Sequence, residues 1–301
     1  MNFLKEEDPD LKATLVVLTY NKRRFEDEKE YYDVEQDKQF INDYYRSIEF
    51  NLEDNKELYK QLKQLITKTH VNQLAYNAKT RELLYTQVDL QANGTLKSIY
   101  SGKAKDPEQV VREDYESEGK RQQARDMLLI SNLNNDDFQR AVTIINQENM
   151  FNCEHVVPQS WFHEENPMRG DLHHLFTCEK ECNSARSNYP YFDFVDYPPN
   201  VETEAIRDDC GKSEKGKFEP ESGKGEVARA TLYFLLRYPG EISRYTHEDI
   251  EMLLNWHQVH EVSLYEKHRN KEIFLIQKNR NPFIDFPQLV RKIDFMCGLT
   301  M

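Results

Sequence analysis

The stretch of sequence that decides the fold is Phe151-Asn-Cys-Glu-His-Val-Val-Pro-Gln-Ser-Trp161. Val156 and Val157 are β-branched, which favours a strand, and Pro158 has no N–H to donate to a sheet. The stretch therefore predicts a short strand over residues 154–157 that ends at the proline.

Two further motifs follow this strand closely. A loop over residues 158–170 contains prolines and a glycine, and Leu172-His-His-Leu-Phe176 then predicts a second short strand. Residues 179–188 contain neither proline nor glycine and predict a helix. The expected local architecture is two strands followed by a helix.

The predicted helix carries Asn183 and Arg186 on one face, and the strands can bring Glu154 and His155 against that face. Glu154 offers a carboxylate oxygen and Asn183 an amide oxygen. With phosphate oxygens and water, such ligands suit Mg²⁺. An imidazole beside this metal site is a candidate general base for water attacking phosphorus. The residues therefore favour hydrolysis of a phosphodiester, with His155 as the base.

These motifs resemble the catalytic element of the bacterial endonuclease I family, within the His-Me finger (ββα-metal) nucleases. The similarity lies in the order and spacing of Glu154-His-Val-Val-Pro158, Asp171-Leu-His-His-Leu175 and Asn183-x-x-Arg-Ser-Asn188. The resemblance implies an α+β fold, with a ββα-metal element embedded in a mostly helical domain that has a small antiparallel sheet. It also implies a Mg²⁺-dependent, largely sequence-nonspecific endonuclease. The histidine of the first motif would be the general base, and its glutamate and the asparagine of the third motif would be the metal ligands.

The implied substrate is DNA, with RNA as an alternative, cut to 5′-phosphate and 3′-hydroxyl ends. Mn²⁺ or Ca²⁺ is expected to substitute for Mg²⁺. The phosphate would be gripped by Arg169, on the loop between the strands, or by Arg186, and the sequence leaves both open. His173 and His174 would face opposite sides of the second strand, so one of them can point at the site.

Five cysteines are present, and four of them lie in or soon after the catalytic region: Cys153, Cys178, Cys182 and Cys210. Three interpretations stay open: a structural Zn²⁺ site, disulfide bonds, or small buried thiols without any bond. We expect at least Cys178, Cys182 and Cys210 to converge, either as Zn²⁺ ligands or as a disulfide plus a free thiol.

The chain is expected to contain an N-terminal extension over residues 1–55, which is acidic and tyrosine-rich, and an endonuclease I-like catalytic domain over residues 56–301. Residues 103–150 are longer than the usual connection in the family. Their apolar residues predict two added helices, which we expect to contribute core and not chemistry.

Outside the catalytic region, the sequence predicts several further elements. Leu15-Val-Val-Leu18 suggests a strand, and residues 82–88 and 96–100 predict two strands with a hairpin turn at Asn93-Gly94. Residues 208–225 are rich in lysine and glycine and predict a loop. Apolar residues at helical spacing predict helices over residues 56–69, 226–238, 246–256 and 262–279.

The net charge of −13 argues against a protein that coats nucleic acid electrostatically. An enzyme needs only a local basic groove and gains little from tight nonspecific binding. Two rivals stay open: a non-catalytic, zinc-stabilised nucleic-acid-binding module, and a zinc hydrolase with Glu154, His155 and one histidine of residues 173–174 as ligands. The second rival lacks the His-Glu-x-x-His helix that would support it.

A mean hydropathy of −0.85 and the lack of a long apolar run exclude a membrane span. Residues 1–10 are acidic, so we expect no export signal there, whereas the resembled family is commonly periplasmic or secreted. The compartment therefore stays open. We expect the protein to be a monomer. Its expected binding partner is the nucleic-acid substrate.

Overall fold

The computed structural model describes residues 8–131, 134–197 and 210–299 of the 301-residue chain. It is mostly helical with small antiparallel pairs of strands, which confirms the α+β class. The helices are α1 (Pro9–Phe25), α2 (Glu28–Tyr31), α3 (Val34–Tyr44), α4 (Asn55–Thr69), α5 (Ala78–Leu83), α6 (Pro107–Leu129), α7 (Asn135–Glu148), α8 (Lys180–Arg186), α9 (Lys224–Arg237), α10 (His247–Val259), α11 (Leu264–Gln277) and α12 (Pro282–Asp285). The strands pair as β1 (Leu96–Lys97) with β2 (Ala104–Lys105), β3 (Cys153–His155) with β4 (Leu175–Thr177), and β5 (Gly211–Glu214) with β6 (Lys217–Pro220).

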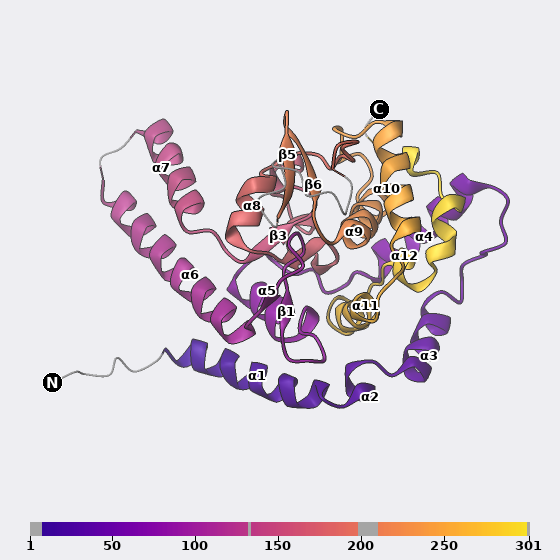
Figure 1. Ribbon diagram of the computed structural model, residues 1–301, viewed down its shortest axis with the longest axis horizontal. Coiled ribbons are helices and arrows are strands. Elements are labelled where there is room, and N and C mark those ends of the chain that lie inside the picture. The colour runs from indigo at the N-terminus through magenta and orange to yellow at the C-terminus, as the bar shows by residue number, and fades with distance from the viewer. Residues whose placement is uncertain (1–7, 132–133, 198–209, 300–301) are drawn as a thin grey trace.

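Helix α9 is the centre of the larger hydrophobic core, as its apolar sequence predicts, and α10 lies beside it (Figure 1). Its side chains are buried from Val227 to Arg237. Helix α4 packs on it through Leu58, Leu62 and Ile66, which share one face of that helix. Because α9 also contacts the turn that leads into β4, this core supports the predicted catalytic strands from behind.

Asp171 is a buried polar centre just before that turn. Its carboxylate accepts hydrogen bonds from the hydroxyls of Tyr233 (2.8 Å) and Tyr238 (2.9 Å) on and beside α9, and from the side-chain amide of Gln277 (2.9 Å). Burial by itself raises the pKa of Asp171, but the neighbouring histidines, His70 first, and the bond from Gln277 hold the pKa well below its ordinary value. A carboxylate is therefore part of the core that positions β4.

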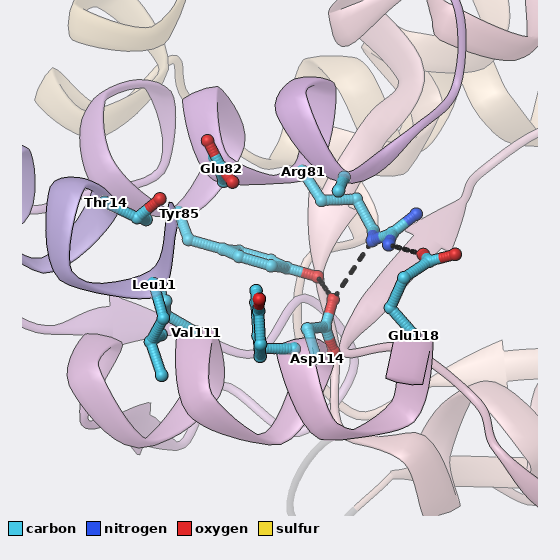
Figure 2. A pocket seen from close by; sticks show the side chains of 10 residues that line it. Leu11, Thr14, Arg81, Glu82, Tyr85, Val111, Asp114 and Glu118 are labelled. Atoms are coloured by element: carbon cyan, nitrogen blue, oxygen red, sulfur yellow. Dashed lines mark hydrogen bonds and ion pairs between the residues drawn. The ribbon is translucent and has the colours of Figure 1, made fainter. Parts of the chain in front are cut away.

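The strand predicted at Leu15–Leu18 is wrong, because these residues lie within α1. Asp8 caps this helix and Pro9 occupies its first position, both of which are typical helix starts. Leu11, Leu18 and Phe25 recur every seven residues and are buried in a cluster with residues of α6 and of the turn that follows α5. Figure 2 shows this region, where α1 lies beside α5 and α6.

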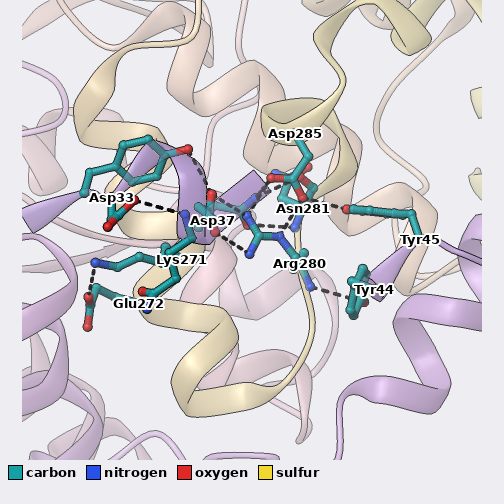
Figure 3. A network of polar contacts seen from close by, with 12 residues as sticks. Asp33, Asp37, Tyr44, Tyr45, Lys271, Glu272, Arg280, Asn281 and Asp285 are labelled. Carbon is teal, nitrogen blue, oxygen red and sulfur yellow. Dashed lines mark hydrogen bonds and ion pairs between the residues drawn. The ribbon is translucent and has the colours of Figure 1, made fainter. Parts of the chain in front are cut away.

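The N-terminal residues are also joined to the C-terminal part of the chain by buried ion pairs. Arg280 lies between two carboxylates, with 2.9 Å to Asp37 of α3 and 2.8 Å to Asp285 of α12 (Figure 3). The hydroxyl of Tyr45 donates to Asp285 at 2.8 Å. Residues 8–54 therefore pack as part of the same body as the helices that follow them.

The two strands predicted over residues 82–88 and 96–100 are largely wrong. Asn77 caps α5 by accepting from the Thr80 N–H at 3.1 Å, and Leu84–Val88 continues as a π-helical turn. A short apolar run fits either a strand or a helix face, and here the capping asparagine and the tertiary packing favour the helix. The Asn93-Gly94 turn is present, with the Gln91 N–H bonded to the Thr95 carbonyl at 2.9 Å, but β1 pairs with β2.

Two other predictions need correction. The second catalytic strand begins later than expected, because Asp171 caps a 3₁₀ turn over Leu172–His174 and only Leu175–Thr177 is extended. The described part of the predicted loop 208–225 contains the β5–β6 hairpin, while residues 208–209 lie outside the described chain. Lys215 and Gly216 both have positive φ, 51° and 73°, as a tight hairpin turn of this kind requires.

The two helices predicted over residues 103–150 are confirmed as α6 and α7. They lie side by side as an arm that projects from the body (Figure 1), and residues 132–133 of their connection lie outside the described chain. We refer to α6 and α7 together as the α6–α7 arm. Among the described residues, none of the helices combines the length and apolar character that crossing a bilayer requires.

Candidate active site

Strands β3 and β4 and helix α8 bring the predicted catalytic residues together. Glu154 and His155 on β3 pair with Phe176 and Leu175 on β4, and α8 begins three residues after β4 ends. The side-chain amide of Asn183 on α8 donates to the Cys153 carbonyl at 3.0 Å. This bond holds α8 against the strand that carries Glu154 and His155.

Glu154 is buried at the base of the site, with 3% of its surface exposed. Its Oε1 accepts from the Tyr100 hydroxyl at 2.7 Å and from Arg186 at 2.8 Å. Burial raises the pKa of Glu154 to about 7, against the opposing effects of Arg186 and Tyr100. The carboxylate is therefore held in one orientation, in an environment where an additional positive charge would stabilise it.

The ring of His155 is held in one orientation by its neighbours. Its Nε2 lies 2.9 Å from the backbone carbonyl of Arg169, and its ring packs edge-on against Tyr76 and His174. Burial lowers the pKa of His155 well below its ordinary value, so the imidazole is neutral at pH 7. A carbonyl can only accept, so Nε2 carries the proton and Nδ1 keeps its lone pair.

The two candidate phosphate-binding arginines have different environments. Arg186 is buried, and its guanidinium donates to Glu154, to the His155 carbonyl (3.1 Å) and to the Val156 carbonyl (2.6 Å). Arg169 is about one third exposed and bonds to Gln159 at 2.6 Å and to Glu164 at 3.0 Å. The more accessible Arg169 can exchange a surface partner for a phosphate, whereas Arg186 is committed to the β3 backbone.

All five predicted catalytic and metal-binding residues line one open cleft of about 380 Å³. Three sides of the cleft come from different parts of the chain: strand β3 with α8, the loop that contains Arg169, and the α6–α7 arm. The members of this set are Glu154, His155, Arg169, Asn183 and Arg186.

Other residues of the cleft were not predicted as site residues, and four of them belong to the helices of the α6–α7 arm. These four are Arg121 of α6 and Thr143, Asn146 and Gln147 of α7, and Met150, two residues after α7 ends, also lines the cleft. No local motif marks them. The one available sequence signal was the polar face of an amphipathic helix. Exposure of that face to solvent would give the same pattern.

Neither His173 nor His174 lines the cleft. His174 lies behind His155, with its Nε2 2.6 Å from the Met168 carbonyl, and His173 lies 3.4 Å from the Asn279 carbonyl. Burial lowers the pKa of both rings. The expectation that one of them points at the site is wrong, because both belong to the 3₁₀ turn and not to a strand.

The cysteines are arranged around α8. Cys182, directly before Asn183, forms a disulfide with Cys210 beside β5, whereas Cys153 and Cys178 are buried free thiols. Burial raises the pKa of both thiols, and for Cys153 it outweighs the opposing effect of Arg81. Within residues 8–131, 134–197 and 210–299, no three His, Cys, Asp or Glu side chains are grouped as a metal site would require.

Comparison with known proteins places this architecture in a family. The sequence model of the family described as "Endonuclease I" matches residues 55–288, which is most of the chain. This chain therefore belongs to the endonuclease I family.

Individual relatives carry nuclease names of two kinds. The chain is 32% identical over 139 residues to an extracellular ribonuclease of Bacillus subtilis (strain 168), covering 41% of this chain and 46% of that protein. It is 29% identical over 158 residues to an extracellular deoxyribonuclease of Aeromonas hydrophila, covering 46% of this chain and 66% of that protein. A periplasmic deoxyribonuclease of the same organism is 30% identical over 124 residues, covering 40% of this chain and 50% of that protein. The matches thus span about half to two thirds of the length of these relatives.

Proposed function

We propose that this protein is a metal-dependent endonuclease that hydrolyses phosphodiester bonds of DNA, with RNA as an alternative substrate, to 5′-phosphate and 3′-hydroxyl ends. Membership of the endonuclease I family and relatives named deoxyribonuclease and ribonuclease support a hydrolase that acts on nucleic acid. The observation that carries the proposal is the meeting of Glu154, His155 and Asn183 in one open cleft. In this reading β3, β4 and α8 are a His-Me finger element.

The side chains of the cleft fit a hard divalent cation. Asn183 uses its Nδ2 to hold the Cys153 carbonyl, which leaves its Oδ1 as a ligand, and Glu154 supplies a carboxylate whose burial favours a nearby positive charge. One carboxylate and one amide oxygen suit Mg²⁺, which keeps several waters, and Mn²⁺ or Ca²⁺ could substitute. When bound, the cation would supply charge stabilisation at the phosphate and at the leaving 3′-oxygen.

The protein residues have separate tasks in this proposal. His155 takes the proton of the attacking water on Nδ1, because Nε2–H is held by the Arg169 carbonyl. Arg169 grips the phosphate by charge-assisted hydrogen bonds. Arg186 donates to the carbonyls of His155 and Val156 and to the carboxylate of Glu154, so it positions the carboxylate. Together these groups orient water and phosphate for in-line attack.

The alternative of a non-catalytic, zinc-stabilised binding module receives less support. A Cys₄ site needs four thiolates, but Cys182 and Cys210 are joined to each other. A zinc hydrolase is likewise less supported, since His173 and His174 turn away from the cleft.

A plasmid-nicking assay with and without EDTA tests the proposal. We expect nicking with Mg²⁺, none with EDTA, and strongly reduced nicking by a His155→Ala variant at equal protein. Ligation of the nicks without prior end repair would support the predicted 5′-phosphate and 3′-hydroxyl ends. Nicking that persists in EDTA, or that is equal in the His155→Ala variant, would refute the mechanism.

A further inference from the structure

The α6–α7 arm lines the same cleft as the loop that carries Arg169 and Gln159, and forms one wall of it. Asn146 and Gln147 follow Thr143 by three and four residues, so these three share one face of α7, and all three line the cleft. The apolar face of α7 is only half-buried, and no residue of this helix is fully buried. Helix α7 thus contributes more to the cleft than to the core, contrary to the expectation from sequence.

The inner end of the arm is fixed to the catalytic strand. Arg121 of α6 donates to the carbonyls of Asn146 (2.8 Å) and Asn149 (2.7 Å), which secures the last turn of α7. The carboxylate of Asp114, also on α6, accepts from the backbone N–H of Asn152 at 2.7 Å. Asn152 directly precedes β3, so the last turn of α7 has a defined position relative to Glu154 and His155.

The inner end of the arm is also held to α5. Arg81 of α5 pairs with Glu118 at 2.5 Å and with Asp114 at 3.3 Å (Figure 2). The guanidinium groups of Arg81 and Arg121 both lie over the ring of Phe151, at 3.4 and 4.0 Å from its centroid. These contacts fix the inner half of α6 on α5 and Phe151, and α6 in turn holds the last turn of α7.

The chemistry of this wall fits a polyanion. Although the chain carries a net charge of −13, the wall contributes Arg121, a hydroxyl and two amides to the cleft, and no carboxylate. The acidic residues that line the cleft are Glu154 and Glu164, each within 3.0 Å of an arginine that offsets its charge. The carboxylates that line the cleft are therefore offset by arginines, although the protein as a whole is acidic.

We propose that the Thr143–Gln147 face of α7 contacts the sugar-phosphate backbone of the bound strand beside the scissile phosphate, so that the arm contributes to substrate affinity. The proposal rests on the proposed function. Amides and hydroxyls bond to phosphates and sugars without reading the bases, which agrees with cleavage of little sequence preference. Gln147 is the most direct probe, because it is exposed and lines the cleft.

The test introduces a positive or a negative charge at Gln147 and, as a matched control, at another position on the same arm. Gln123 of α6 is also an exposed glutamine, but it does not line the cleft and lies about 200° around the helix from Arg121. We would make Gln147→Lys, Gln147→Glu, Gln123→Lys and Gln123→Glu in a His155→Ala background. Binding of a fluorescently labelled single-stranded oligonucleotide is then measured by anisotropy over a series of salt concentrations.

We expect Gln147→Lys to tighten binding and to steepen the slope of log K against log salt by about 0.7, the value for one added phosphate contact on a single strand. Gln147→Glu should weaken binding, and both Gln123 variants should match their parent. Equal shifts at the two positions, or no shift at Gln147, would overturn the proposal. Failure of the proposed function is a separate outcome, because the otherwise unaltered protein would then not cut DNA in the nicking assay.

Discussion

Removal of the Cys182–Cys210 disulfide is predicted to cost both stability and activity. The bond joins α8, directly before Asn183, to the residue before β5, and the two cysteines are 28 residues apart. In the chain-entropy model, closing a loop of 28 residues stabilises the fold by about 3.6 kcal/mol at 25 °C. The double variant Cys182→Ser/Cys210→Ser should lose about this free energy of unfolding, which corresponds to a melting temperature lower by roughly 5–10 °C.

Urea unfolding of the double variant, with and without dithiothreitol, measures the effect. Reductant should lower the stability of the unaltered protein to that of the variant and should leave the variant unchanged. Thiol titration after denaturation should find three of the five cysteines free. Cleavage should fall as well, because α8 would be held to β5 mainly by the bond from the Ser213 hydroxyl to the Ala185 carbonyl at 2.7 Å.

Cys297 provides the control for this prediction. It is exposed and forms no disulfide, so Cys297→Ser should change neither stability nor activity. Five titratable thiols in the protein purified without reductant, or equal unfolding curves for the double variant and the unaltered protein, would refute the reasoning.

Three other predictions follow from the site and its support. His155→Ala should keep the fold and the metal affinity but lower cleavage by about 10²–10⁴-fold in a steady-state assay, and an unchanged rate would exclude His155 as the base. Glu154→Ala and Asn183→Ala should raise the Mg²⁺ concentration needed for half-maximal cleavage, and excess Mg²⁺ should partly restore the rate; an unshifted Mg²⁺ titration would mean that the ligands are others. Asp171→Asn should lower the free energy of unfolding by about 2–4 kcal/mol, because an amide cannot accept the same hydrogen bonds as the carboxylate. Because the pKa of Asp171 is lowered, its stabilisation of the fold is complete above about pH 4 and is lost as the pH falls further. The free energies of unfolding of the Asp171→Asn variant and of the unaltered protein should therefore converge in acid. A difference between them that stays constant with pH would contradict this.

The sequence by itself determined the local parts of the candidate site. Glu154 and His155 are neighbours on a strand, although β3 ends at His155 and not at Pro158 as predicted, and Asn183 and Arg186 are three residues apart on a helix. Such relations follow from the geometry of one strand and one helix, so no knowledge of the rest of the fold was needed. The capped helices were predictable for the same reason, as Thr246 before α10 illustrates.

Short apolar runs were the least predictable local features. Residues 15–18 and 82–88 are each compatible with a strand or with one face of a helix, because a few residues do not distinguish a period of 2 from a period of 3.6. Their conformation is decided by caps and by contacts with distant residues, such as the bond from the Asn21 side chain to the Thr86 carbonyl at 2.9 Å.

Only the tertiary structure decided which distant residues complete the site. The sequence left the partner of Cys182 open, because pairing over 28 residues depends on how the β5–β6 hairpin lies against α8. The sequence also left Arg169 and Arg186 as equal candidates for binding phosphate, whereas their different burial in the structure distinguishes them. The α6–α7 arm became a wall of the cleft because Asp114 and Arg121 fix it beside β3, and contacts between residues about 30 positions apart leave no periodic signal in the sequence.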